Sequence, residues 1–219
     1  MWSVYIDRHQ ADRSFRFADL LRRQDEVLSR IRPLHESALV FAELPPTLTL
    51  GARQVHQADP ARLSEFQELG IEVVSGERGG NETWHGPGQW VGFVLTSLES
   101  FTGDSKGVRL AVFKILDLLL PVVQEFIPEA RIEEGARLGI WSNRGKVVSI
   151  GIKIREGYTT SGFAINCIPN ERAFAGINPC GIAQAKPDFL FRDFSDQSEV
   201  EKNFQRIPER ILNCFSQKK

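Results

Sequence analysis

The spacing of apolar and polar residues along the chain predicts helices that alternate with short strands. Within residues 106–126, for example, Val108, Val112 and Ile115 fall on one face at helical spacing. Asp59-Pro60 is typical of a helix N-terminus, because proline is tolerated at the first helical position. We expect helices over residues 11–31, 60–69 and 106–126, and a last helix that begins near residue 208.

Runs of β-branched and aromatic residues predict strands over residues 38–42, 47–50, 71–74, 90–95, 139–141, 147–154 and 163–167. In the longest run, Val148, Ile150 and Ile152 share one face, and Lys146 precedes it. The strands cluster in the middle of the chain, with helices at both ends and between them. This order favours an α+β fold with a mixed sheet over a regular βαβ series.

Composition is that of an ordinary globular protein. The chain has 219 residues, of which 42% are hydrophobic, so disorder, collagen and coiled coil are excluded and one domain over residues 1–219 is expected. The 27 Lys and Arg residues nearly balance the 28 Asp and Glu residues, giving a net charge of −1. Because nucleic-acid binders usually carry a basic surplus, we expect no nucleic-acid partner, although a local basic face remains open.

Neither a signal peptide nor a membrane span is expected. Charged residues precede any apolar run of signal-peptide length at the N-terminus. The longest apolar stretch, residues 115–123, contains Asp117 and Pro121 and is too short to cross a bilayer. We therefore expect a cytoplasmic protein with no membrane partner.

The three cysteines offer one candidate nucleophile. They contain no Cys-x-x-Cys pair, so neither a disulfide framework nor a zinc site is expected. Cys167, at the end of a strand, and Cys214, on the last helix, fit buried structural thiols. Cys180 lies between Pro179 and Gly181, at an exposed bend. A cysteine attacks as the thiolate and needs a positive neighbour, and a lone loop cysteine is more often inert.

Residues 78–89 form the densest candidate binding segment. Four glycines within it allow a close backbone approach to a ligand, and Arg78, His85 and Gln89 add polar groups. The segment is neither a Walker A loop nor a GxGxxG motif. The alternative is a hairpin connection whose glycines only satisfy turn geometry.

Lys146 stands at the start of an apolar strand that contains Gly151, which suggests that a ligand approaches the strand closely. Its ammonium group could then assist a thiol or hold a carbonyl oxygen. Considered alone, the residue fits better a surface lysine at a strand end.

Together these segments resemble a known family. Leu-Gly at 50–51, Arg-Gly-Gly at 78–80, Thr-Trp-His-Gly-Pro-Gly-Gln at 83–89, Gly-Lys-Val-Val-Ser-Ile-Gly at 145–151, Gly-Phe-Ala-Ile-Asn at 162–166 and Pro-Cys-Gly-Ile at 179–182 follow one another in order. They resemble the lipoyl(octanoyl) transferases, over roughly residues 38–185. The resemblance implies the fold of the biotin/lipoate protein ligase catalytic domain, with a largely antiparallel mixed sheet flanked by helices.

The resemblance also implies a reaction and its residues. An acyltransferase of this kind moves octanoyl from octanoyl-acyl carrier protein to a lysine of the lipoyl domains of the glycine cleavage H protein and the oxoacid dehydrogenase complexes. Cys180 would form the acyl-thioenzyme with Lys146 as its partner, and no cofactor or metal is expected because the thioester is already activated. The residues expected to bind substrate are Arg78, Gly79, Gly80, Thr83, His85, Gly86, Gln89, Ser149, Ile150, Gly151, Ser161, Gly162 and Ala164.

One position departs from the family pattern. Many members carry a His-Gly pair where this chain has Ser161-Gly162, and a hydroxyl does not shuttle a proton near neutral pH. Three alternatives remain open: an ATP-dependent lipoate–protein ligase, which has no use for Cys180, an octanoyl amidotransferase acting between lipoyl domains, and an idle acyl-binding module.

Overall fold

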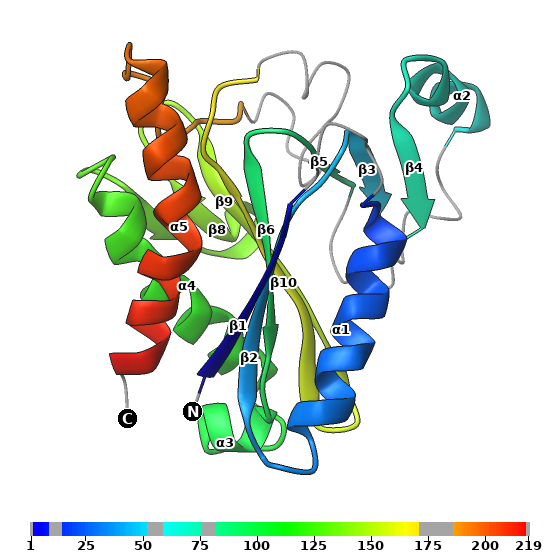
Figure 1. Cartoon of the computed structure of the whole chain (residues 1–219), viewed down its shortest axis with the longest axis vertical. Helices are drawn as coiled ribbons and strands as arrows, with labels where there is room; N and C mark the ends of the chain where they lie inside the picture. Colours follow the sequence, from blue (N-terminus) through cyan, green and yellow to red (C-terminus); the bar gives the residue numbers. More distant parts are fainter. Residues whose placement is uncertain (1, 9–14, 52–58, 76–81, 171–185, 218–219) are drawn as a thin grey trace.

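The computed structural model describes residues 2–8, 15–51, 59–75, 82–170 and 186–217. Its largest element is a seven-stranded sheet with the order β1-β2-β6-β10-β9-β8-β7 (Figure 1). The strands are β1 (Trp2–Arg8), β2 (Ser37–Glu43), β6 (Gln89–Leu95), β7 (Arg131–Glu133), β8 (Gly139–Trp141), β9 (Lys146–Arg155) and β10 (Tyr158–Asn166). β1 and β2 run parallel, and the other neighbouring strands run antiparallel. The expected α+β fold with a mixed, largely antiparallel sheet is confirmed.

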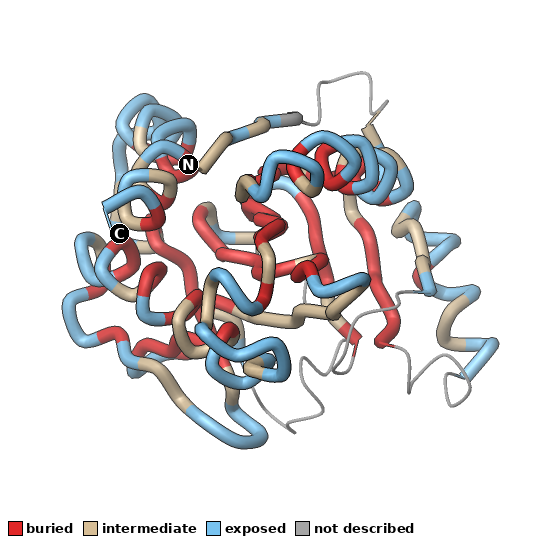
Figure 2. Tube along the Cα trace, turned by 90° about the horizontal axis from the view of Figure 1, so that it is seen from below, coloured by how far each residue is buried: buried red, intermediate tan, exposed pale blue. Residues whose placement is uncertain are grey.

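Helices cover both faces of this sheet. α1 (Phe17–Ile31) packs on one face, and α4 (Val108–Gln124) and α5 (Gln197–Gln217) lie on the other (Figure 1). Successive side chains of β2 alternate between the two cores, because a strand points its residues to opposite sides. Figure 2 accordingly shows buried strands between helices whose outer surfaces are exposed.

A second, three-stranded sheet has the order β4-β3-β5. It consists of β3 (Thr47–Leu50), β4 (Glu72–Ser75) and β5 (Thr83–His85), and α2 (Pro60–Glu68) packs beside it. The Asp59 side chain accepts the Ala61 N–H at 3.0 Å, so the predicted N-terminus of α2 is confirmed. This sheet brings β5, with Thr83 and His85, to the end of the larger sheet.

The last helix is longer than predicted. α5 begins at Gln197, eleven residues before the proline at which we expected it to start, and Pro208 lies inside the helix. Proline has no N–H to donate to the carbonyl four residues earlier, that of Phe204. The Trp90 indole N–H donates to this carbonyl at 2.8 Å, so a tertiary contact satisfies the group that proline leaves without its helical donor.

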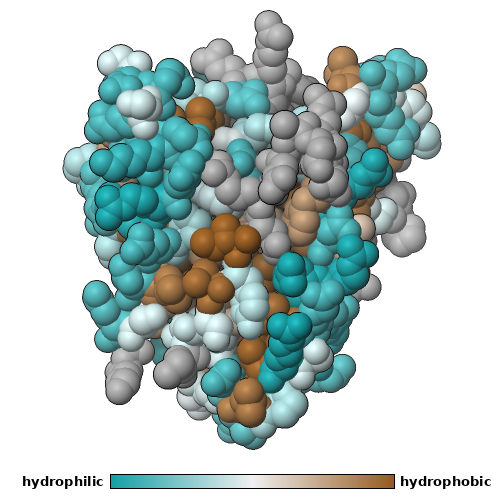
Figure 3. Space-filling view, in the orientation of Figure 1, coloured by the Kyte–Doolittle hydropathy of each residue, from teal (hydrophilic) through white to brown (hydrophobic). Residues whose placement is uncertain are grey.

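Two strands also extend beyond the prediction. β10 begins at Tyr158, five residues early, because Glu156 and Gly157 form a two-residue turn with positive φ of 51° and 77° that starts the hairpin directly after β9. β1 was not predicted. It is the edge strand of the sheet, and its Val4 and Ile6 are 37% and 49% exposed. Figure 3 shows apolar surface over this edge, between α5 and α1.

Polar contacts hold α1 against the β9–β10 hairpin. Arg32, which follows α1, pairs with Glu156 at 2.6 Å and donates to the Arg155 carbonyl at 3.0 Å. Asp25 of α1 pairs with the Arg155 side chain. The helix was expected from residue 11, but it begins at Phe17, and residues 11–14 are outside the described part of the chain. α1 packs on β2 and β6, and these contacts join it to the hairpin of β9 and β10.

Candidate active site

A cavity of about 680 Å³ lies between α1 and the face of the sheet formed by β6, β9 and β10. Paired residues of β9 and β10 form its floor as three successive rungs: Ser149 with Ala164, Gly151 with Gly162, and Lys153 with Thr160. The middle rung carries no side chain beyond hydrogen, which leaves room above the sheet. A Cβ at Gly162 would also fall 2.1 Å from the Gly92 carbonyl oxygen, so only glycine fits there.

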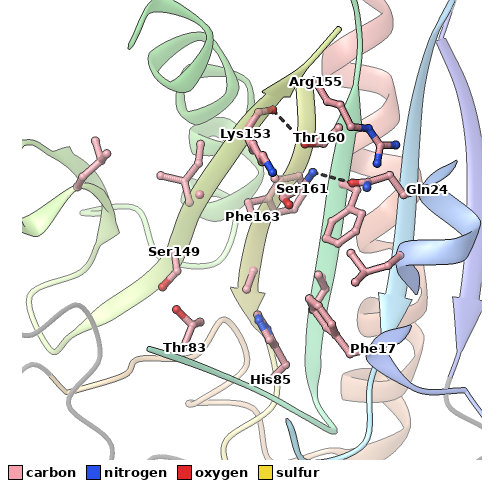
Figure 4. Close-up of a pocket in the computed structure, with 18 of the residues that line it drawn as sticks. Phe17, Gln24, Thr83, His85, Ser149, Lys153, Arg155, Thr160, Ser161 and Phe163 are labelled. Atoms are coloured by element: carbon pink, nitrogen blue, oxygen red, sulfur yellow. Dashed lines mark hydrogen bonds between the residues drawn. The ribbon is translucent and has the colours of Figure 1, made fainter. Parts of the chain in front are cut away.

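The two ends of the cavity differ. Figure 4 places Thr83, His85 and Ser149 at one end, close to the start of β9. It places Lys153, Arg155 and Ser161 at the other end, close to the β9–β10 hairpin. The apolar lining residues between them come mainly from α1, β6 and β10 and include Leu21, Val91, Phe93, Phe163 and Ala164. The cavity is therefore an apolar channel with two polar ends.

Lys146 lines the first end and is buried, with 5% of its surface exposed. Its Nζ donates to the Leu138 carbonyl at 2.7 Å and lies 5.5 Å from the centre of the Trp141 ring. A Cβ at Gly139 would fall 2.7 Å from the Lys146 Cε, so the glycine makes room for the side chain. The interpretation of Lys146 as a surface lysine at a strand end is wrong.

A chain of hydrogen bonds connects His85 with the backbone of Lys146. The His85 Nδ1 lies 2.7 Å from the Gln89 Oε1, and the Gln89 Nε2 donates to the Asn166 Oδ1 at 2.8 Å. The Asn166 Nδ2 in turn donates to the Lys146 carbonyl at 3.1 Å. Since Gln89 offers its oxygen to the ring, Nδ1 carries a proton and donates it, and Nε2 lies 3.4 Å from Thr49 Oγ1.

An aromatic contact orients the same imidazole. The Phe17 ring stacks on the His85 ring with centroids 6.1 Å apart and an interplanar angle of 16°. His85 is 5% exposed and lines the cavity. Its ring is thus held from one side by α1 and from another by Gln89, which gives it a fixed orientation at the end of the channel that Lys146 also lines.

The structure brings most of the described predicted site residues together. Those that line the cavity are Thr83, His85, Lys146, Ser149, Ile150, Gly151, Ser161, Gly162 and Ala164. Gly86 and Gln89 are not among the lining residues. Gly86 packs against the Trp84 ring, and a Cβ on Gly86 would fall 2.2 Å from the Trp84 Cζ2 atom. The Gln89 side chain contacts the His85 ring through its Oε1 and does not line the cavity. Arg78, Gly79, Gly80 and Cys180 lie outside the described residues.

The sequence prediction missed the contribution of α1. Phe17, Leu21 and Gln24 line the cavity from one side of the helix. Gln24 is 4% exposed, and its Oε1 accepts the backbone N–H of Ser161 at 2.8 Å. A polar residue within the apolar stripe of an amphipathic helix is a signal that could have identified it. Ser161 itself has a φ of +60°, a conformation that side chains other than glycine rarely adopt.

The segment that follows residue 185 is joined directly to Lys146. The Lys146 N–H donates to the Lys186 carbonyl, and the Asp188 N–H donates to the Lys146 carbonyl, both at 2.9 Å. The buried Asp188 carboxylate also accepts the Ser142 hydroxyl and pairs with Arg192. Lys186, six positions after Cys180 in the sequence, is therefore hydrogen-bonded to the backbone of the buried lysine.

The other two cysteines lie away from this cavity. Cys167 is fully buried in the core between the sheet and helices α4 and α5, and burial raises the pKa of its thiol well above the ordinary value. Cys214 on α5 is partly buried and packs against the same core. The expectation of a buried thiol is confirmed for Cys167 and in part for Cys214.

Within the described ranges, no group of three His, Cys, Asp or Glu side chains is placed to hold a metal ion. The helices described here are all too short or too polar to span a bilayer.

Comparison with known proteins identifies the family. Residues 17–215 match the model of the lipoyl protein ligase A/B catalytic domain. The chain belongs to this family. It is 31% identical to an octanoyltransferase of Desulforamulus reducens over 196 residues, which cover 90% of this chain and 81% of the relative. It is 35% identical to an octanoyltransferase of Rhodospirillum rubrum over 179 residues, which cover 79% and 78% of the two chains.

Solved structures agree on the fold of this family member. A lipoate-protein ligase A bound with ATP superposes with a TM-score of 0.68 over 97% of this chain and 85% of the other, at 13% identity. A biotin protein ligase of Leishmania major in complex with biotin gives a TM-score of 0.52 over 98% of this chain and 80% of the other, at 11% identity. At such identities the likeness concerns the fold alone, and the expected fold of the biotin/lipoate protein ligase catalytic domain is confirmed.

Proposed function

We propose that the protein transfers an octanoyl group from octanoyl-acyl carrier protein to a lysine of lipoyl domains, through a thioester on Cys180. The observation that carries the proposal is the buried Lys146 at the end of an apolar channel of about 680 Å³. The sequence identity to octanoyltransferases supports the octanoyl group and the acyl transfer. The acceptors we propose are the lipoyl domains of the glycine cleavage H protein and the oxoacid dehydrogenase complexes.

In the first half-reaction, the Cys180 thiolate attacks the carbonyl carbon of the octanoyl thioester. A new bond forms between Sγ and the carbonyl carbon, the bond to the sulfur of the carrier breaks, and the released thiolate takes up a proton. Exchange of one thioester for another needs no further activation. The Lys146 ammonium stabilises the cysteine thiolate and the developing charge on the carbonyl oxygen, because a buried positive charge acts strongly at short range.

In the second half-reaction, the ε-amine of the acceptor lysine attacks the same carbonyl carbon. An amide bond forms, the bond to Cys180 breaks, and the amine loses a proton. Lys146, which became neutral when it gave its proton to the released carrier thiolate, accepts this proton as the general base. His85 holds the substrate carbonyl end in place, since its ring is fixed by Gln89 and Phe17. Thr83 and Ser149 provide further polar contacts at this end of the channel.

The same proposal places the reaction in the cytoplasm. A thiolate nucleophile must stay reduced, and a reducing compartment keeps it so. An ATP-dependent ligase and an amidotransferase between lipoyl domains are the competing activities, and the choice of acyl donor distinguishes all three.

Intact-mass analysis tests the proposal. The full chain is mixed with octanoyl-carrier protein, and we expect its mass to rise by one octanoyl group that hydroxylamine removes. Addition of a lipoyl domain should then move the group to that domain. Cys180→Ser should remain unmodified, whereas the matched variant Cys214→Ser should be acylated like the unchanged protein.

The role of Lys146 is tested in the same assay. Lys146→Ala should lower the rate of acylation about 100-fold, the usual contribution of a positioned acid or base, while the far-ultraviolet circular dichroism stays unchanged. Turnover with an unmodified Cys180 would contradict the mechanism. A requirement for ATP with free octanoate would indicate the ligase activity instead, and an octanoylated lipoyl domain as the obligatory donor would indicate the amidotransferase.

A further inference from the structure

The channel ends in a cluster of polar groups that the transfer reaction does not use. Lys153 and Thr160 form the third rung of the floor, and Gln24 and Ser161 stand beside them. Gln24 uses its Oε1 to accept the Ser161 N–H, and its Nε2 donates to no atom of the described residues. An amide donor at the end of an apolar channel is solvated only while water fills that end.

The distance from the reacting end to this cluster follows from strand geometry. A strand advances about 3.3 Å per residue, so Gly151 lies about 7 Å and Lys153 about 13 Å beyond Ser149. On the opposite wall, Phe17 and Gln24 are seven residues apart on α1, which is about 10 Å at the rise of a helix. Both walls give the apolar part of the channel a similar length.

An extended acyl chain can be compared with this length. A chain of single bonds advances about 1.2 Å per bond, as an extended backbone does, so the seven bonds of an octanoyl group span about 8 Å. With its carbonyl carbon at the level of Ser149, the chain passes over the Gly151–Gly162 rung. Its methyl end then lies about 5 Å short of the level of Lys153, just beyond van der Waals contact. Two further methylenes would shorten this gap to about 2–3 Å, closer than van der Waals contact with the polar cluster.

We propose that Gln24, Lys153 and Ser161 at the far end of the channel limit the acyl chain to about eight carbons. A longer chain removes water from the Gln24 amide without offering its Nε2 an acceptor, and it places methylenes against the charged Lys153 ammonium. Such desolvation offsets the gain from burying the extra methylenes. The Asp25–Arg155 pair stands at the same end and joins α1 to β9 there. This inference rests on the proposed acyl transfer at Cys180.

Competition between two donors tests the limit. The full chain is mixed with equal amounts of octanoyl- and decanoyl-carrier protein, and intact mass gives the ratio of the two adducts at early times. Lys153→Met should raise the decanoyl-to-octanoyl ratio about tenfold, which is what two newly accepted methylenes contribute. Gln24→Met should raise it in the same direction, with thermal unfolding as the check that the variant is folded.

Two control variants test whether the change in ratio depends on the charge at position 153. Lys153→Arg retains the positive charge and should keep the ratio of the unchanged protein, and Lys202→Met, on the exposed side of α5, should do the same. Equal ratios in Lys153→Met, Gln24→Met and the unchanged protein, with octanoyl adducts still formed, would overturn the chain-length inference alone. Absence of any adduct from the unchanged protein would overturn the transfer mechanism together with it.

Discussion

At the scale of single residues, burial decides which thiol can react. Cys167 has no exposed surface, its Sγ lies 3.5 Å from the Ile165 carbonyl oxygen, and burial raises the pKa of the thiol. Because the thiolate is the reactive form, this cysteine cannot serve as a nucleophile in the folded protein. The burial of Cys167 thus supports the prediction from the sequence that Cys180 is the nucleophile.

Burial should also slow the alkylation of the Cys167 thiol. Iodoacetamide at pH 8 should modify Cys167 about 100-fold more slowly in the folded protein than in the denatured protein, because folding suppresses the thiolate. Mass spectrometry of the digested protein measures this. Similar labelling rates in both states would show that the thiol is accessible.

The raised pKa of Cys167 also has a thermodynamic consequence. An unfolded thiol ionises above a pH of about 8.5, whereas the folded thiol stays neutral. Its contribution to stability is therefore present below this pH and is lost as the pH rises. The free energy of unfolding should fall between about pH 8 and pH 10, and Cys167→Ala should reduce the slope. An unchanged slope in the variant would assign the pH dependence to other groups.

At the scale of elements, α5 shows how tertiary contacts override a local signal. Pro208 marks a helix start by propensity, yet the helix begins eleven residues earlier, where the Asp196 carboxylate accepts the Ser198 N–H at 2.8 Å, and it continues through the proline because Trp90 supplies a donor to the Phe204 carbonyl. The Trp90 and Phe204 rings also stack, with centroids 5.0 Å apart. The Trp90 side chain on β6 thus compensates for the backbone donor that Pro208 lacks on α5.

A double-mutant cycle tests this pairing. Trp90→Phe removes the indole donor and should lower the free energy of unfolding by about 1–3 kcal/mol, because a buried carbonyl loses its partner. In a Pro208→Ala background the loss should be smaller, since the alanine that replaces the proline has a backbone N–H that can donate to the same carbonyl. Urea unfolding at equilibrium gives both values. Equal losses in the two backgrounds would show that the hydrogen bond contributes nothing beyond ring packing.

At the scale of the whole molecule, one ionic cluster joins distant segments beside the active site. Asp188 contacts Ser142, which follows β8, and its backbone N–H donates to the Lys146 carbonyl. Arg192 pairs with Asp188 and also contacts Glu129 at 3.3 Å. The cluster therefore connects the segment after residue 185 with β8, with β9 and with the turn that follows α4.

Asp188→Asn should lower the free energy of unfolding by about 3 kcal/mol, because it removes the buried partner of Arg192. Asp193→Asn is the matched control. Asp193 pairs with the same arginine at 3.2 Å, but its side chain is 66% exposed, so the change should be much smaller. Denaturant unfolding of both variants measures the difference, and equal effects would contradict a special role for the buried carboxylate.

The amino-acid sequence by itself determined most elements and much of the site. Periodicity predicted α2, α4 and the strands β2, β3, β4, β6, β8 and β9 within a few residues, because their apolar spacing and their Gly and Pro boundaries are local properties, whereas β5 lies in the segment interpreted as a Gly-rich loop. The motifs around His85, Lys146 and Gly162 identified residues that do line one cavity. A sequence motif can do this because catalysis restricts the residue type at each position.

Only the tertiary structure decided the rest. The burial of Lys146, the polar end formed by Gln24 and Lys153, and the extension of α5 past Pro208 depend on contacts between segments far apart in the sequence or on the space between two elements. Residue type and local spacing carry no information about such distances. The sequence therefore indicated which chemistry to expect, and packing determined how long a chain the channel admits.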